Sequence, residues 1–79
     1  MTNREKFNQA FMEVFGVEEN VLGKEFSKDN VDSWDSVHQL NIIAILEETF
    51  DLMFDPEDIM ELTSYEKAVA LMAKYDVEL

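Results

Sequence analysis

The sequence predicts an all-α fold: an irregular four-helix bundle with three longer helices, one short helix and a long loop between helices one and two. Apolar residues recur with the period of an amphipathic helix, whereas strand-like alternation is scarce. Only two glycines and one proline interrupt the chain. A chain of 79 residues has room for a single hydrophobic core. We therefore expect residues 1–79 to form one domain.

The first predicted helix covers residues 3–15. Thr2 and Glu5 have the spacing of a capping box at its start, and Gly16 suits the position after its end. Its apolar stripe falls at i, i+3, i+4, i+7 and i+8 and consists of Phe7, Ala10, Phe11, Val14 and Phe15.

Residues 17–35 form the predicted long loop, which is polar and has no helical period. A loop of this length is uncommon in a small domain and is often functional. We expect it to be ordered, with one short turn, because six apolar anchors can hold it on the core: Val17, Val21, Leu22, Phe26, Val31 and Trp34.

The second predicted helix begins at Asp35 or Ser36 and ends near Phe50. Asp35 is a good N-cap, and its charge suits the positive end of the helix dipole. Ile42 and Ile45 make the helix apolar over more than half of its circumference, as in a central helix with surplus apolar surface for partners. The residues expected to face inward are Val37, Leu40, Ile43, Ala44 and Leu46.

Two helices complete the predicted bundle. Asp55 followed by Pro56 is typical of an N-cap and a first helical position, and predicts a short helix to about Glu61. Thr63 and Glu66 have capping-box spacing and predict the start of a last helix. Its stripe consists of Ala68, Leu71, Met72 and Tyr75.

The chain is strongly acidic, with 18 acidic and 6 basic residues and a net charge of −12. This charge argues against nucleic acid or an anionic membrane as a partner, because both would repel it. No Lys or Arg lies between Lys28 and Lys67, so an acidic surface there either only aids solubility or steers basic partners. No apolar run has the length of a membrane span, and Met1–Lys6 does not resemble a secretory signal. We therefore expect a cytoplasmic protein.

Enzyme and metal motifs are not found. Without cysteine the chain has no disulfide, thiolate metal site or thiol nucleophile. Asp35, Ser36 and His38 lie within one helical turn, which does not allow the geometry of a catalytic triad. Calcium loops starting at Asp29 or Asp51 lack the glycine required at the sixth position. We predict neither catalytic activity nor a metal site.

The segment Trp34–Leu40 contains Asp35 and Ser36 followed by the aliphatic Val37. Here the chain resembles the acyl carrier protein family, whose attachment motif is Asp-Ser followed by Leu or another aliphatic residue. A lone tripeptide would be weak evidence, but the resemblance extends along nearly the whole chain. It includes the first helix, the long loop and the segments Leu46–Phe50, Asp55–Asp58 and Leu62–Ser64.

The resemblance implies a 4′-phosphopantetheine arm on Ser36, attached by a phosphopantetheinyl transferase whose magnesium Asp35 supports. The arm would carry acyl groups as thioesters between acyl-loading and acyl-transferring enzymes with basic docking patches. Val37, Glu47 and Glu48 are the implied partner contacts. A phosphodiester at a helix N-terminus also suits the helix dipole. We expect a monomer that serves fatty acid biosynthesis or, by preference, a specialised metabolite or saccharide pathway.

That preference for a specialised pathway depends on three residues. His38, Gln39 and Asn41 stand where carriers of fatty acid synthesis usually have acids early in the second helix. An aminoacyl or peptidyl carrier is an alternative, although such carriers typically have a Gly-rich approach to the serine, where this chain has Trp34 and Asp35.

Two further alternatives concern Ser36 itself. Asp32-Ser33 is a second Asp-Ser pair, but Trp34 follows it where the motif requires an aliphatic residue. An unmodified acidic helical interaction module would use the acidic surface alone and would not need Ser36.

Overall fold

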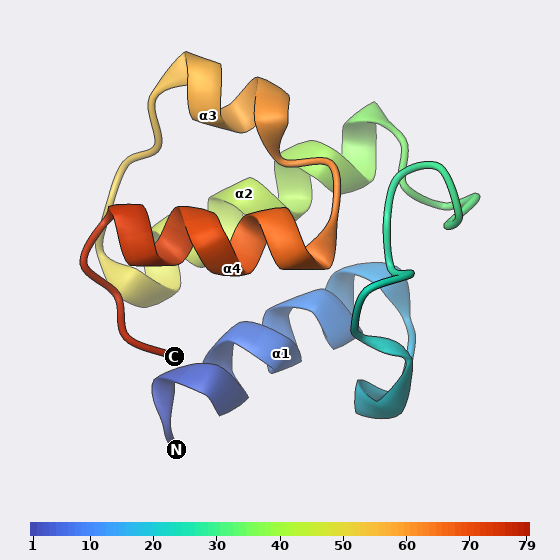
Figure 1. The fold of residues 1–79 in the computed structure, drawn as a ribbon, viewed down its shortest axis with the longest axis horizontal. Coiled ribbons are helices and arrows are strands. Elements are labelled where there is room, and N and C mark those ends of the chain that lie inside the picture. Colours follow the sequence, from blue (N-terminus) through green and yellow to red (C-terminus); the bar gives the residue numbers. More distant parts are fainter.

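The computed structural model describes residues 1–79 and has the predicted all-α fold of four helices (Figure 1). A 3-10 turn, η1, supplies the short turn expected in the long loop. None of the helices is both long enough and apolar enough to span a membrane. The elements in order are α1 Asn3–Phe15, η1 Glu19–Val21, α2 Ser36–Phe50, α3 Pro56–Glu61 and α4 Tyr65–Lys74.

The ends of α1 are those that the sequence predicts. The Thr2 side chain accepts the Glu5 backbone N–H, and the Glu5 carboxylate accepts the Thr2 N–H, each at 3.1 Å. Gly16 then adopts the left-handed conformation with φ 63° and donates its N–H to the Met12 carbonyl. A residue without Cβ takes this conformation at no steric cost, so the helix stops there.

The start of α4 differs from the prediction, because Ser64 and not Thr63 is its N-cap. The Ser64 hydroxyl accepts the Lys67 N–H at 3.0 Å. The reason lies in the long loop, which pairs with this segment in a short antiparallel bridge between Ser27 and Ser64. In this bridge Lys28 N–H donates to the Thr63 carbonyl at 2.8 Å, which holds that segment extended.

Aromatic rings from α1, the loop and α4 fill the core. Phe11 is fully buried, and five ring centroids lie 5.2–6.1 Å from its own: those of Phe7, Phe15, Phe26, Trp34 and Tyr65. Phe26 and Trp34 therefore anchor the loop as predicted. Val21 does not, because the η1 turn leaves half of its surface exposed.

The orientation of α2 corrects a prediction. Ile42, Ile43 and Leu46 are its buried residues, whereas Val37 and Leu40 are each 64% exposed and Ala44 is exposed as well. The buried face brings together three large side chains, those of Ile42, Ile43 and Leu46, whereas the exposed set has only one, Leu40, with the smaller Val37 and Ala44. A helix that is apolar on most sides does not reveal this choice in its sequence.

A buried acid joins α3 to the end of α4. The Asp58 side chain is 5% exposed and accepts hydrogen bonds from Lys74 Nζ at 2.8 Å and from the Tyr75 hydroxyl at 2.6 Å. The Tyr75 hydroxyl in turn accepts the Asp55 N–H at 2.8 Å. These bonds hold the first half of α3 against the end of α4.

Candidate functional site

Ser36 is the first residue of α2, and its side chain is exposed. Asp35 precedes it in an extended conformation (φ −105°, ψ −174°) and accepts the His38 backbone N–H at 2.9 Å. Because Asp35 caps the helix, the Ser36 hydroxyl is not needed for that role. The hydroxyl lies at the positive end of α2 and is exposed to solvent.

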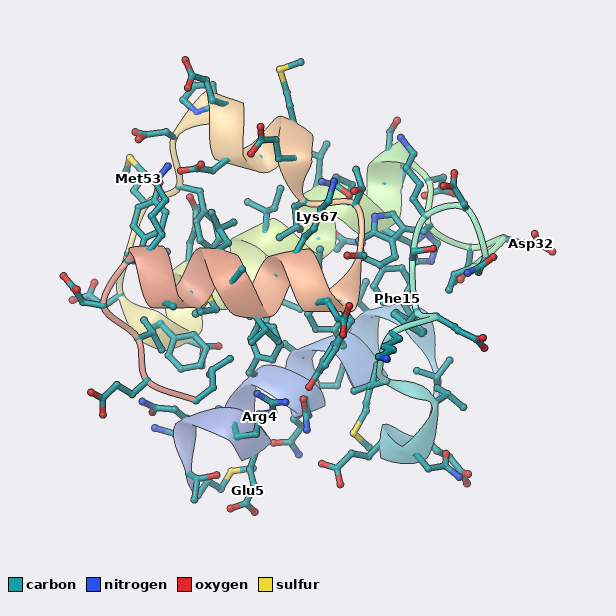
Figure 2. The ribbon with its side chains drawn as sticks, viewed as in Figure 1. Arg4, Glu5, Phe15, Asp32, Met53 and Lys67 are labelled. Atoms are coloured by element: carbon teal, nitrogen blue, oxygen red, sulfur yellow. The ribbon has the colours of Figure 1, made fainter.

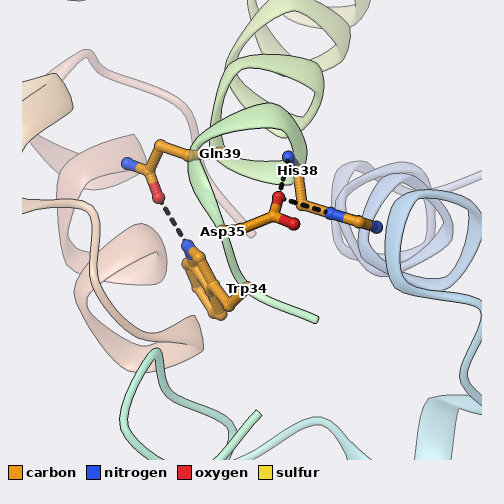
Figure 3. A network of polar contacts seen from close by, with 4 residues as sticks. All are labelled: Trp34, Asp35, His38 and Gln39. Carbon is orange, nitrogen blue, oxygen red and sulfur yellow. Dashed lines mark hydrogen bonds and ion pairs between the residues drawn. The ribbon is translucent and has the colours of Figure 1, made fainter. Parts of the chain in front are cut away.

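Asp35 and His38 also form a side-chain pair (Figure 3). His38 Nδ1 lies 2.7 Å from Asp35 Oδ1, and the imidazole stacks on the Phe15 ring with centroids 5.7 Å apart. The backbone hydrogen bond from His38, and then its side-chain bond, lower the pKa of the Asp35 carboxyl below the ordinary value of 3.8. Asp35 is thus a carboxylate at neutral pH, and 59% of its side chain is exposed.

Gln39 connects three parts of the fold next to Ser36. Its Oε1 accepts the indole N–H of the buried Trp34, a contact that Figure 3 shows. Its Nε2 donates to the Ile59 carbonyl of α3 at 2.9 Å. One amide therefore links the long loop, α2 and α3, and both of its ends are hydrogen-bonded.

An open groove of about 390 Å³ lies between α2 and α3 and includes Ser36 at its edge. Its apolar sides are exposed, since Leu40 is 64% and Met60 80% accessible. Lys28, from the loop, adds a cation. The lining residues are Lys28, Ser36, Gln39, Leu40, Ile59, Met60 and Thr63.

The three predicted partner contacts differ in their surroundings. Val37 and Glu48 are exposed, and their spacing of eleven residues along α2 places them on one face of the helix. Glu47 is only partly exposed, and its Oε2 accepts the Phe54 N–H at 2.8 Å. This carboxylate therefore holds the segment that follows α2. The roles of all three in partner binding stay predictions.

The second Asp-Ser pair has a different setting. Asp32 lies at the outer tip of the loop (Figure 2), and Ser33 precedes the cap of α2, where its carbonyl accepts the Asp35 N–H at 2.9 Å. Ser33 is not at a helix N-terminus, whereas Ser36 is. Of the two Asp-Ser pairs, only the one at Ser36 lies at the start of a helix.

The parts that Gln39 and Lys28 play in this site were not predicted from the sequence. Gln39 had a signal: it lies three residues before Ile42 and four before Ile43, so it shares their buried face, where a polar residue requires hydrogen-bond partners. Lys28 had none. Its place in the groove depends on how the long loop folds back onto the Thr63 carbonyl.

No group of three or more His, Cys, Asp or Glu side chains is positioned to hold a metal ion. No protein-family model matches the sequence, and no curated protein matches it. The resemblance to acyl carrier proteins therefore stays a prediction, drawn from the residues themselves and from the surroundings of Ser36.

Proposed function

We propose that this chain is an acyl carrier and not an enzyme: it bears acyl groups as thioesters on a 4′-phosphopantetheine arm attached to Ser36. One observation carries the proposal. Ser36 is exposed at the first position of α2, and Asp35 supplies the cap in its place. A serine needed only as a cap would hold the position of Asp35.

The residues around Ser36 fit a phosphodiester and a flexible arm. The N-terminus of α2 offers backbone N–H groups and a positive dipole to a phosphodiester. Lys28 lines the same groove and adds a positive charge in a chain with few of them. Leu40 and Met60 give the arm an apolar surface to lie against. Once attached, the arm supplies the thiol that carries the acyl group.

Attachment requires a transferase, coenzyme A and Mg²⁺. The Ser36 hydroxyl oxygen forms a bond to the β-phosphorus of coenzyme A while the bond from that phosphorus to the 3′,5′-ADP oxygen breaks. The electron pair leaves with 3′,5′-ADP, and the hydroxyl proton passes to a base of the transferase. The resemblance gives Asp35 the role of a magnesium ligand in this step, and an accessible carboxylate suits that role.

The outer face of α2 is the surface that we assign to partner enzymes. Val37 and Leu40 expose apolar surface there, and Glu48 adds negative charge. Partners with basic patches would bind through steered, short-lived contacts that fit a carrier visiting several enzymes. Because His38, Gln39 and Asn41 replace early acids on α2, we favour partners of a specialised metabolite or saccharide pathway over those of fatty acid synthesis. An aminoacyl carrier would use the same site.

The test is the intact mass of the protein after incubation with coenzyme A, Mg²⁺ and a phosphopantetheinyl transferase of broad specificity. The parent, Ser36→Ala and Ser33→Ala proteins are compared. We expect one phosphopantetheine on the parent and on Ser33→Ala, and none on Ser36→Ala. A folded parent that gains no mass with several such transferases would instead support the unmodified interaction module.

A further inference from the structure

Gln39 is a partly buried polar residue of α2, three positions after Ser36. It precedes the buried Ile42 and Ile43 on the same face of the helix, and it lines the groove onto which Ser36 opens. Its amide is hydrogen-bonded at both ends, with Oε1 accepting the Trp34 indole N–H and Nε2 donating to the Ile59 carbonyl. The groove is therefore lined in part by a polar bridge between α2 and α3.

An acyl chain that entered the bundle from Ser36 between α2 and α3 would have to displace this amide. The Trp34 side chain is 3% exposed, so its N–H would then lack both water and a protein partner. The Ile59 carbonyl would lose the Gln39 amide as well. Leaving buried donors and acceptors unpaired opposes entry more strongly than burying a few methylene groups favours it.

The indole that Gln39 binds belongs to a packed aromatic cluster. Trp34 packs against Phe15 with ring centroids 4.9 Å apart and against Phe26 at 5.8 Å, and Phe11 fills the centre of the same cluster. These rings hold the Trp34 indole in place, so its N–H cannot turn to another partner when Gln39 is displaced.

We propose that Gln39 closes the interior to the cargo, so that the acyl group stays outside the bundle and the carrier takes short or polar acyl groups. The inference rests on the proposed function. A long aliphatic chain held outside would expose its apolar surface to water, which is unfavourable, whereas a short or hydroxylated or amino-substituted acyl group carries no such cost. The groove between α2 and α3 covers one side of such a group only.

The experiment loads the protein from acetyl-, hexanoyl- and decanoyl-coenzyme A with the same transferase, and intact mass verifies each loaded form. The thermal midpoint Tm of each form is then measured for the parent, for Gln39→Leu and for Asn41→Leu. Asn41 is exposed two residues further along α2, so it receives the same amide-to-leucine change away from the groove. Gln39→Met replaces Gln39→Leu if that variant does not fold.

We expect the parent and Asn41→Leu to have the same Tm with all three acyl groups. Gln39→Leu should gain stability with chain length, by about 4 °C or more from acetyl to decanoyl. Nuclear Overhauser contacts between the decanoyl chain and the Ile43 or Leu46 methyl groups should occur only in Gln39→Leu.

A parent protein whose Tm rises with chain length, and whose core methyl groups contact the decanoyl chain, would overturn the inference while leaving the carrier function intact. Equal Tm values in Gln39→Leu would overturn the role assigned to Gln39. If Ser36 gains no mass at all, the proposed function fails first and this inference fails with it.

Discussion

The Asp35 carboxylate holds His38 at two points, since Oδ1 accepts the His38 backbone N–H at 2.9 Å and lies 2.7 Å from the ring nitrogen Nδ1. One side chain thus caps α2 and fixes the imidazole against Phe15. The proposed function gives the same carboxylate a third task, as a ligand of the transferase's magnesium. Substitutions at Asp35 can separate capping from metal support.

Asp35→Asn should keep the cap and lose the metal ligand, because asparagine is as good an N-cap as aspartate but carries no charge. We expect a Tm close to that of the parent and a modification rate at Ser36 lower by roughly tenfold or more. Asp35→Ala should lower both. Circular dichroism melting and timed intact-mass measurements give the two quantities. A fast-modified Asp35→Asn would mean that the charge of Asp35 plays no part in the transfer.

Lys28 should stabilise the modified form and not the bare one. A cation near a new phosphodiester at the surface contributes about 0.2–1 kcal/mol. Modification should therefore raise the free energy of unfolding more in the parent than in Lys28→Gln, and the difference between the two gains should be of this size. The difference should vanish near 1 M salt, where the Debye length is about 3 Å. Urea unfolding of both forms measures it.

Lys24→Gln is the matched control for that experiment, because Lys24 is also an exposed loop lysine but lines a different hollow of the surface, beside Arg4. It should behave like the parent. If modification raises the free energy of unfolding equally in all three proteins, Lys28 does not interact with the phosphodiester.

Substitutions at Glu47 and Glu48 should distinguish a carboxylate that stabilises the fold from one that contacts partners. Glu47→Ala removes the acceptor of the Phe54 N–H and should lower the Tm. Glu48→Gln removes an exposed charge, so it should leave the Tm unchanged and raise the transferase KM at low salt. Melting curves and initial rates at two salt concentrations check both. An unchanged KM in Glu48→Gln would argue against docking at this end of α2.

The stability of the fold should depend on the ionisation of Asp58 in acid. Hydrogen bonds from Lys74 and then from Tyr75 lower the pKa of the Asp58 carboxyl below its ordinary value of 3.8. Since the folded pKa lies below the unfolded one, this contribution is fully present above the unfolded value and is lost as the pH falls through the folded value. Urea unfolding as a function of pH measures this contribution. The free energy of unfolding of the parent should exceed that of Asp58→Asn near neutrality, and the two values should converge in acid.

Asp32→Asn is the control for the acid limb, because Asp32 lies exposed at the tip of the loop (Figure 2). Its curve should follow that of the parent. If the difference in the free energy of unfolding between the parent and Asp58→Asn stays constant down to the lowest pH, the ionised Asp58 does not provide the stability assigned to it.

Local signals in the sequence were enough to predict most of the fold. The capping box of Thr2 and Glu5, the Gly16 stop and the Asp35 cap act within one helical turn, so the sequence alone shows them. The outward turn of Val37 and Leu40 could not be predicted, because α2 is apolar on most sides and only packing against the other elements decides which side is buried.

Contacts between distant segments were also beyond the sequence. Ser64 replaces Thr63 as the cap of α4 because the long loop pairs with that segment. Lys28 reaches the surroundings of Ser36 through the same pairing. In the candidate site, the motif at Asp35 and Ser36 could be predicted from the sequence. The groove between α2 and α3 and the position of Lys28 could not.

The pairing of Ser27 with Ser64 also has a consequence for the lifetime of the site. The Lys28 N–H donates to the Thr63 carbonyl, and the Tyr65 N–H donates to the Phe26 carbonyl. Neither amide can exchange its hydrogen with solvent until the loop separates from the start of α4. The segment that leads into Ser36 and the first turn of α4 should therefore open as one cooperative unit. While α4 stays folded, the loop stays in place. The rate at which α4 opens therefore limits the rate at which the structure around Ser36 is lost.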